Sequence, residues 1–406
     1  MQKKALVLAL GAALMIPSAA YAQKSKDKPE ADSVVELYGK VYPELIFPSS
    51  KGATSVGTPL CTICGSARPS TFVSRTELDS SNSRFGIRGH EKLAPGLKAI
   101  FQLETQFLVD QNTTTFATRD SFVGLASGWG TVKLGRMDTP FKDYGDDVSF
   151  LGVSSGNITS TSNVYRHVGF GTQNRAARFH ERAINVVQYE SPHLGPFEWK
   201  SQYSAGENDT TSPPRRPHWW SHGGKLEFGN FEILAGYEQH LDFFGLSANA
   251  PTAMRNTTDP NVRSKDEAFE VALKLKVGKH QFEIDANKKR YRENGATVTG
   301  RVQEYKNTAY MFLYDVRLSP QWRLAFHYVK AKQGTCARVN AVCNTDGLDG
   351  SQTSLGVAYH FSRRTYLFLM GAFIKNGYSA VYNSAAQGIA PGEDVRQIAA
   401  GIHTAF

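Results

Sequence analysis

Hydrophobic and polar residues alternate with a period of two in segments that recur along the chain. In residues 96–108 (GLKAIFQLETQFL), the odd positions from 97 to 103 are apolar, whereas positions 98, 102, 104 and 106 carry charged or amide side chains. Residues 268–277 (AFEVALKLKV) and 322–328 alternate in the same way. Because successive side chains of a β-strand point to opposite faces, this pattern predicts strands with one apolar and one polar face.

Sixteen such segments can be placed along the chain, which predicts an all-β protein. Short turns, such as residues 94–96 and 319–320, alternate between them with long polar loops. An even number of strands joined in this way is typical of an antiparallel transmembrane β-barrel, and sixteen strands leave a water-filled lumen. The alternative is a soluble β-sandwich, which needs neither strands of ~10 residues nor aromatic strand ends. The predicted strands cover residues 34–47, 83–93, 96–108, 116–127, 130–138, 182–192, 196–206, 218–228, 231–241, 267–277, 280–292, 303–318, 321–333, 351–361, 364–377 and 394–406.

The first 22 residues are typical of a cleavable export signal. Lys3 and Lys4 precede an apolar run over residues 5–16, and the small residues of Ala20-Tyr21-Ala22 suit a cleavage site. The apolar run is shorter than the ~18–20 residues of a membrane-spanning helix, which disfavours a helical anchor. We therefore expect cleavage after Ala22 and a single barrel domain over residues 23–406.

Composition and charge narrow the range of functions. Mean hydropathy is −0.36 although 11% of the residues are aromatic, as expected where apolar and polar positions alternate. The formal net charge of +9 becomes +7 when the signal and its two lysines are removed. The basic residues are spread among the strands without a recognition helix, so nucleic acid is not an expected partner. Because no nucleophile elbow joins a strand to a helix and no His-Glu-x-x-His motif occurs, we expect neither catalytic residues nor a cofactor.

Five segments carry a family resemblance in their order and spacing. They are residues 35–41 (VELYGKV), 83–93 (SRFGIRGHEKL), 96–104 (GLKAIFQLE), 121–136 (SFVGLASGWGTVKLGR) and 182–192 (RAINVVQYESP). Together they resemble the Gram-negative general diffusion porins of the β-proteobacterial, or neisserial, type. The resemblance extends over nearly the whole mature chain.

The resemblance implies a homotrimer of 16-stranded barrels in the outer membrane, surrounded by lipid and lipopolysaccharide. Each barrel would let small hydrophilic solutes and ions diffuse passively through a channel narrowed by an inward-folded third loop. That loop corresponds here to about residues 139–183, although the stretch 156–179 departs from the family pattern. Phe406 resembles the terminal aromatic residue by which the outer-membrane assembly machinery recognises its clients, and the last strand is expected to pair with the first.

Opposed charges are expected across the narrow part of the channel. Asp143, Asp146 and Asp147 form an acidic group in the third loop, and Arg84 and Arg88 lie on the polar face of the second predicted strand. Such charges create a transverse field that orients dipolar solutes. The basic mature chain predicts a mild preference for anions, which the loop aspartates would oppose. The candidate pore-lining residues are Arg84, Arg88, Arg178, Arg182, Asp143, Asp146, Asp147, Lys98 and Glu104.

Two other functional hypotheses stay open. One is a substrate-selective channel with a site for a particular anion or organic acid, which a saturable block of the current by one solute would reveal. The other, with less support, is an adhesin or a barrel enzyme.

The four cysteines occur as two pairs in predicted loops, Cys61 with Cys64 and Cys336 with Cys343. An even number of cysteines in an exported protein predicts disulfides. One small ring in each loop is the simplest pairing, and a bridge between the loops is the alternative. A redox or metal role for the Cys-x-x-Cys pair lacks the surrounding motifs that such sites require, so no metal site is assigned.

Overall fold

The computed structural model describes residues 32–52, 60, 75–112, 115–145, 150–151, 158–171, 175–206, 210–211, 214–384 and 389–406. The expected export signal over residues 1–22 lies outside the described residues. The same holds for four of the candidate residues. They are Cys61, Cys64, Asp146 and Asp147.

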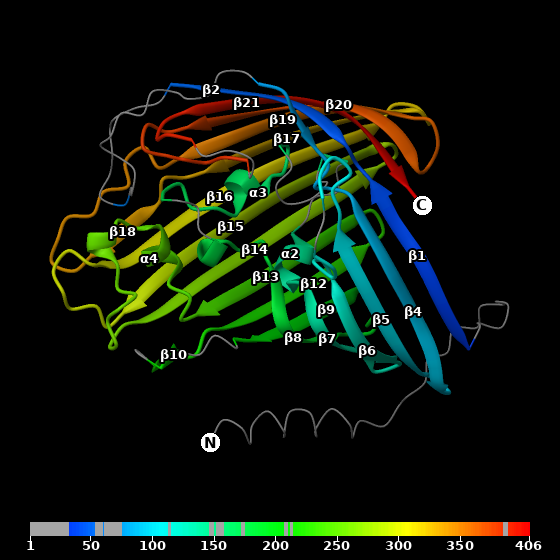
Figure 1. Cartoon of the computed structure of the whole chain (residues 1–406), viewed down its shortest axis with the longest axis horizontal. Helices are drawn as coiled ribbons and strands as arrows, with labels where there is room; N and C mark the ends of the chain where they lie inside the picture. The colour runs from blue at the N-terminus through cyan, green and yellow to red at the C-terminus, as the bar shows by residue number, and fades with distance from the viewer. Residues whose placement is uncertain are drawn as a thin grey trace.

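The wall of the molecule is a closed antiparallel barrel of sixteen strands, as the alternation predicts (Figure 1). Its sheet contains 19 hydrogen-bonded segments. β1 (Ser33–Val41) and β2 (Glu44–Lys51) form one wall strand, and β3 (Glu77–Asp79) and β18 (Thr335–Arg338) are short additions. The other wall strands are β4 (Arg84–Ala94), β5 (Leu97–Gln106), β6 (Ser121–Ser127), β7 (Gly130–Asp138), β8 (Arg182–Glu190), β9 (Phe197–Ala205), β12 (His218–Phe228), β13 (Phe231–Leu241), β14 (Arg263–Val277), β15 (His280–Asn294), β16 (Val302–Arg317), β17 (Trp322–Ala331), β19 (Gly350–His360), β20 (Thr365–Asn376) and β21 (Asp394–Ala405).

The first wall strand differs from the continuous strand predicted over residues 34–47. It breaks at Tyr42 and Pro43, where proline supplies no N–H for the ladder. Before the break β1 pairs with β4, and after it β2 pairs with β21. The break therefore lies where the pairing with β4 ends, while the pairing with β21 continues from β1 into β2.

Other strand ends also differ from the prediction. Residues 116–120 precede β6 as irregular chain, and β14 begins four residues before the predicted 267. The short strands β10 (Thr210–Thr211) and β11 (Pro214–Arg215) form a separate hairpin outside the wall. Such ends depend on loop contacts that alternation does not encode.

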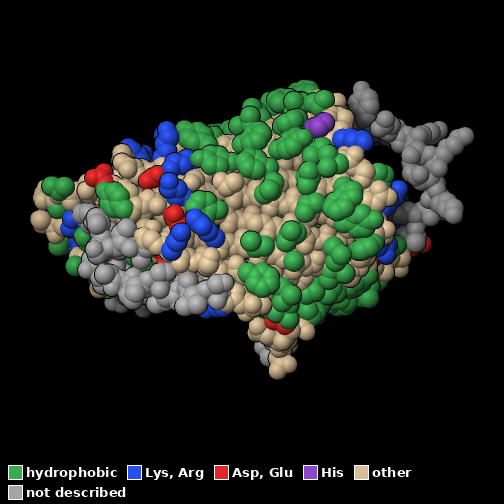
Figure 2. Space-filling view, turned by 90° about the horizontal axis from the view of Figure 1, so that it is seen from above, with side chains coloured by type: hydrophobic (Ala, Val, Ile, Leu, Met, Phe, Trp, Pro, Cys, Tyr) green, Lys and Arg blue, Asp and Glu red, His purple; other side chains and the backbone are tan. Residues whose placement is uncertain are grey.

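Apolar side chains lie on the outward face of the barrel, at the strand positions where the alternation predicts them. Leu103, Val123 and Leu134 are exposed hydrophobic residues on neighbouring strands. Figure 2 shows a band of hydrophobic side chains over one outward face, with Lys and Arg side chains toward both ends of it. Among the described residues, no helix is both long and apolar enough to cross a membrane.

The last residue closes the barrel onto the first strand. The N–H of Gly39 donates to the carbonyl of Phe406 at 3.3 Å, and the N–H of Phe406 donates to the carbonyl of Gly39 at 3.1 Å. β21 also pairs with β20 on its other side. Closure leaves no open sheet edge in the wall, which a lipid environment requires.

The third loop enters the barrel and packs against its inner wall. Its described parts include α2 (Pro140–Tyr144), α3 (Ser162–Tyr165) and the 3-10 turn η1 (Arg175–Ala177). Thr139 caps α2, because its side chain accepts a hydrogen bond from the N–H of Lys142, and Pro140 suits the first helical position. Figure 1 shows α2 and α3 inside the ring of strands.

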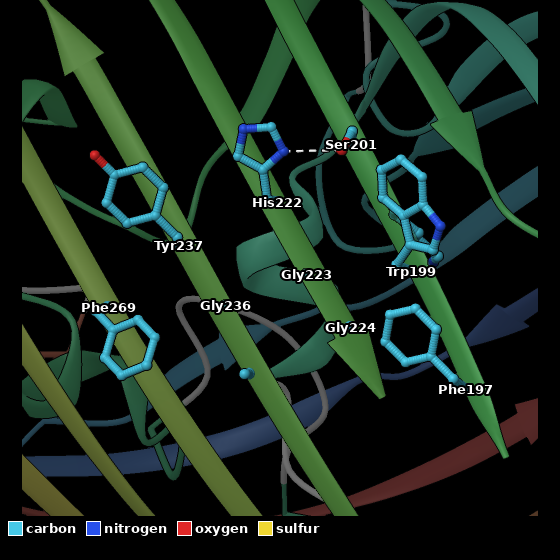
Figure 3. Close-up of a pocket in the computed structure, with 11 residues that line it drawn as sticks. Phe197, Trp199, Ser201, His222, Gly223, Gly224, Gly236, Tyr237 and Phe269 are labelled. Atoms are coloured by element: carbon cyan, nitrogen blue, oxygen red, sulfur yellow. Dashed lines mark hydrogen bonds between the residues drawn. The ribbon is translucent and has the colours of Figure 1, made fainter. Parts of the chain in front are cut away.

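The barrel wall has glycines, and so no side chains, at two positions where α2 packs against it (Figure 3). A side chain at Gly223 of β12 would collide with the ring of Tyr144, and one at Gly236 of β13 would press on Phe141. Glycine at these two positions therefore lets α2 lie directly on the backbone of the sheet.

The structure joins Cys336 and Cys343 in a disulfide at the tip of the loop that contains β18. The ring is small, with a sequence separation of 7. β18 also pairs with the end of β16, so the bridge adds to an existing hairpin.

Replacing both cysteines with serine is expected to loosen this loop and leave the barrel intact. Closing so short a ring contributes about 2–3 kcal/mol to local order in the chain-entropy description. Limited proteolysis should then cut near residues 336–343 faster than in the wild type, with an unchanged melting temperature of the barrel. A fall in the barrel melting temperature would contradict the local role.

Candidate functional site: a charged cluster beside the third loop

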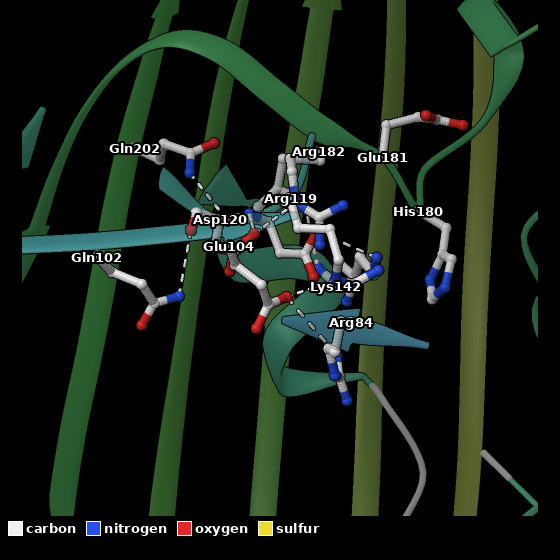
Figure 4. Close-up of polar contacts among 12 residues, drawn as sticks. Arg84, Gln102, Glu104, Arg119, Asp120, Lys142, His180, Glu181, Arg182 and Gln202 are labelled. Carbon is white, nitrogen blue, oxygen red and sulfur yellow. Dashed lines mark hydrogen bonds and ion pairs between the residues drawn. The ribbon is translucent and has the colours of Figure 1, made fainter. Parts of the chain in front are cut away.

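Glu104 of β5 is the centre of one group of charges on the inner wall (Figure 4). Its carboxylate forms an ion pair with Arg119, lies 3.8 Å from Nη1 of Arg84, and accepts a hydrogen bond from the Tyr38 hydroxyl at 3.0 Å. The Arg84 side chain is 30% exposed, against 15% for Arg119. Arg84 therefore offers the more accessible charge to a solute.

Arg182 is the centre of a neighbouring group, at the start of β8 where the third loop ends. Its Nε pairs with Asp120, and its Nη2 lies 2.8 Å from Oδ1 of Asp138. Asp138 also forms an ion pair with Lys142, with Oδ1 and Nζ 3.1 Å apart. Because Lys142 belongs to α2, these contacts attach the loop to the wall through charges.

The two groups contain slightly more positive than negative charge. Four cations and three carboxylates give a formal balance of +1. A low-dielectric wall strengthens the field of such groups. The residues are Arg84, Arg119, Lys142, Arg182, Glu104, Asp120 and Asp138; this set is called the constriction cluster below.

A buried arginine fixes the middle of the third loop to the opposite part of the wall. Nη2 of Arg166 donates to Glu270 of β14 at 3.1 Å and to the carbonyl of Gly145 at 2.6 Å. Burial, with nearby cations, lowers the pKa of His180, so its neutral ring accepts a hydrogen bond at Nδ1 from Arg166 at 2.7 Å. Arg166 is 1% exposed, so its charge holds the loop and does not face the solute path.

Wall residues donate further hydrogen bonds to the backbone of the loop. Lys289 of β15 reaches the carbonyls of Tyr165 and His167 at 2.6 and 3.0 Å, and Asn287 reaches the carbonyl of Tyr165 at 2.8 Å. Charged and amide donors thus satisfy carbonyls at the end of the short helix α3.

Asp143 is the one described member of the predicted acidic group in the loop. It projects from α2 toward Lys200 of β9, with Oδ2 and Nζ 2.8 Å apart. Desolvation of the carboxylate by the surrounding protein raises the pKa of Asp143 to about 6, and the charge of Lys200 opposes the rise. The carboxylate is therefore ionised at neutral pH and takes up a proton in mildly acidic solution.

Lowering the pH from 7.5 to 5 is expected to increase the preference of the channel for anions. Above pH 6 ionised Asp143 balances Lys200, and below it the neutral acid leaves the lysine charge uncompensated. Reversal potentials under a salt gradient at the two pH values measure this change. Asp143→Asn should show the acidic behaviour at both values, and an unchanged pH response of that variant would contradict the assignment.

The remaining candidate residues lie outside the constriction cluster. Arg88 pairs with Glu36 at 2.9 Å, nearer the short turns. Lys98 lies near the turn end of β5, opposite Lys92. Arg178 lies 3.7 Å from Glu181 in the loop.

The cluster also contains residues that alternation alone did not select. Arg119 and Asp120 fall in the predicted strand 116–127 but occupy irregular chain before β6, where both side chains reach the lumen. Asp138 and Lys142 flank Thr139, the predicted start of the third loop. Charged residues directly beside the boundaries of an inward loop are the signal that could have indicated them.

Comparison with known proteins assigns the chain to a family. A family model described as Gram-negative porin matches residues 5–378. The major outer membrane protein P.IB of Neisseria sicca is 27% identical over 317 residues, which cover 74% of this chain and 81% of that protein. P.IB of Neisseria gonorrhoeae is 32% identical over 135 residues, or 33% of this chain and 35% of that protein.

Solved structures share the architecture at lower identity. The anion-selective porin from Comamonas acidovorans has a TM-score of 0.68 at 21% identity, covering 92% of this chain and 100% of that one. The trimer form of OmpT from Vibrio cholerae has a TM-score of 0.62 at 16% identity, covering 93% and 100%. The family match, the closed barrel and the inward loop agree: the chain belongs to the Gram-negative porin family and forms a diffusion channel in the outer membrane.

Proposed function

We propose that this porin is a general diffusion channel with a mild preference for anions and that it works as a homotrimer. The observation that carries the selectivity is the positive balance of the constriction cluster, with Arg84 as its most exposed cation. A ring of basic side chains is a common device for favouring anions in pores. The anion-selective porin with a similar fold supports the same choice.

The family and a structural neighbour support the proposal that the barrel forms a homotrimer. OmpT, which shares the fold, has a trimer form. The terminal aromatic residue Phe406, already held against Gly39, is the proposed contact for the assembly machinery. Transport needs no cofactor or covalent step, because solutes move down their own gradients.

Single-channel recording in a planar bilayer tests this function. Purified, refolded protein should give conductance steps in groups of three, and the reversal potential under a salt gradient should favour anions. A cation-favouring potential would show that carboxylates dominate the pore field, whereas folded barrels that give no steps would contradict the channel.

A substrate-selective channel is the second candidate, because a cavity of about 290 Å³ lies beside the cluster. Arg136, Arg175, Arg182 and Trp219 line it together with Glu181, which pairs with Arg175. Among the described residues, Nε of Arg136 and Nε1 of Trp219 are buried without a hydrogen-bond partner. Such donors suit a carboxylate or phosphate, so saturable block of the current by a small organic acid would favour this candidate.

A further inference from the structure

The sequence contains two Asn-Gly pairs, Asn294-Gly295 and Asn376-Gly377. An asparagine followed by glycine can lose its side-chain amide without an enzyme, because glycine has no side chain to hinder the approach of its own backbone nitrogen. Each of these asparagines is the last residue of a wall strand, β15 in one case and β20 in the other. The two pairs therefore share their chemistry and their place at a strand end, so a difference in reactivity must come from their surroundings.

The structure fixes the pair at the end of β20. Asn376 is 7% exposed, and its Nδ2 donates to the carbonyls of Tyr382 and Glu393 at 3.0 and 2.7 Å. Its Oδ1 accepts from the N–H of Tyr382 at 2.8 Å, and the N–H of Gly377 donates to the carbonyl of Asp349 at 2.8 Å. Hydrogen bonds thus hold both reacting groups, the side-chain amide and the backbone nitrogen that would attack it.

The pair at the end of β15 is not fixed in this way. Asn294 and Gly295 are exposed, and within the described ranges neither the Asn294 side chain nor the N–H of Gly295 forms a hydrogen bond. The pairing of β15 with β16 ends at Arg292, so Asn294 is paired on one side only, with Arg263 of β14. Gly295 has a φ of +92°, which glycine adopts readily, and the chain turns directly after the asparagine.

The loss of the amide at this pair needs no reagent except water. The backbone nitrogen of Gly295 bonds to Cγ of Asn294 as the Cγ–Nδ2 bond breaks, and ammonia leaves with the proton of that nitrogen. Water then opens the cyclic imide and gives aspartate or isoaspartate. Either product places a carboxylate where the chain had a neutral amide.

Arg263, the cross-strand partner of Asn294, holds a strained turn at the start of the loop over residues 242–262. Its Nε donates to Oδ1 of Asp242 at 2.8 Å. Asp242 and Phe244 have φ values of +62° and +54°, in the left-handed region that residues other than glycine adopt at a cost. The ion pair with Arg263 therefore stabilises a conformation that the chain itself disfavours.

Other contacts hold the same turn independently of Arg263. The N–H of Asp242 donates to the carbonyl of Ser264 at 3.0 Å, and the N–H of Phe244 donates to Oγ of Ser264 at 2.8 Å. The guanidinium group of Arg215 lies 4.0 Å from the centre of the Phe244 ring. Loss of the Arg263 contact should therefore loosen the loop and leave the wall strands paired.

We propose that Asn294 is a deamidation site of the folded protein and that the new carboxylate draws Arg263 away from Asp242. Positions 294 and 263 are direct cross-strand partners, and opposite charges at such positions attract. The Arg263 side chain is 57% exposed, so it can turn toward position 294. Asp242 then loses its partner, and the loop over residues 242–262 opens more often. Loops on this side face the outside in barrels of this kind, so the modification changes the outer surface of the protein and not its channel.

Peptide mapping by mass spectrometry tests the modification in folded protein that is kept in warm, mildly alkaline buffer. Aspartate and isoaspartate should accumulate at position 294 at least about 30-fold faster than at position 376, because several hydrogen bonds must open before Asn376 can react. In protein unfolded with urea, both pairs should react at similar rates. Equal rates in the folded protein, or reaction of Asn294 only after unfolding, would overturn the site.

The variant Asn294→Asp tests the consequence directly. Added protease should cut the loop over residues 242–262 several-fold faster than in the wild type. Asn294→Gln is the matched control, because it keeps a neutral amide at this position, and it should be cut like the wild type. In a protein that already carries Arg263→Gln, the change Asn294→Asp should have no further effect.

Two results would contradict the release of Arg263. One is equal cutting of the aspartate and glutamine variants, and the other is faster cutting caused by Asn294→Asp when Arg263 is already replaced. An unchanged heat-dependent shift in gel mobility and an unchanged conductance would show that each variant still forms a folded channel.

Discussion

Replacing Arg84 with glutamate is expected to reverse the preference of the channel from anions to cations. The substitution changes the formal balance of the constriction cluster from +1 to −1 at its most exposed cation. It also places a second carboxylate near Glu104, where like charges in a narrow passage act over a short distance. The ratio of anion to cation permeability should fall by about tenfold, measured from reversal potentials under a salt gradient.

Arg263→Glu is the matched control for this experiment. Arg263 is 57% exposed, lies on the outward parity of β14 and pairs with Asp242 at the strand end. The same change of charge outside the lumen should leave the reversal potential near the wild-type value. If both variants shift the potential equally, the total charge of the barrel, and not the constriction cluster, controls selectivity.

Replacing Arg166 with methionine is expected to release the third loop from the wall. The variant would leave the carboxylate of Glu270 buried without its guanidinium partner, a loss that costs about 3–5 kcal/mol in buried pairs. The carbonyl of Gly145 and the ring of His180 lose a donor as well. Conductance should rise and become noisier, and protease added from the loop side should cut the third loop.

The double variant R166M/E270M tests whether release of the loop arises from the lost contacts of Arg166 or from the charge of Glu270 that remains buried. Removing both members of a buried ion pair is often neutral when the replacements pack well. The double variant should therefore be less sensitive to protease than Arg166→Met alone, although no ionic contact is restored. Equal sensitivity of the two variants would show that direct attachment by Arg166, and not the buried charge of Glu270, keeps the loop in place.

The alternation of side chains was sufficient to predict the barrel and its sixteen strands. A period of two follows from the backbone geometry of every strand, whatever its partner, so segments such as 96–108 could be recognised singly. The break at Pro43 was missed because the apolar pattern continues across it. Only the registers show that the pairing with β4 ends before the break and the pairing with β21 continues after it.

The charged site was less accessible to sequence reasoning. Glu104 lies on a regular strand, so its inward side could be inferred from parity. Arg119 reaches Glu104 from irregular chain, where side chains do not alternate between the two faces and their direction cannot be predicted from position. Arg166 and Glu270 are 104 residues apart, and the path of an inward loop decides which wall residue it meets.

The pairing of Phe406 with Gly39 has a consequence for the order of assembly. Each wall strand after the first can pair with the strand that precedes it. The barrel closes only when β21, already paired with β20, also pairs with the first strand. Until then two rows of N–H and C=O groups lack partners, and each such group costs several kcal/mol in hydrocarbon. Insertion one strand at a time from the N-terminus is therefore unfavourable for this chain, and ring closure must accompany entry into the bilayer.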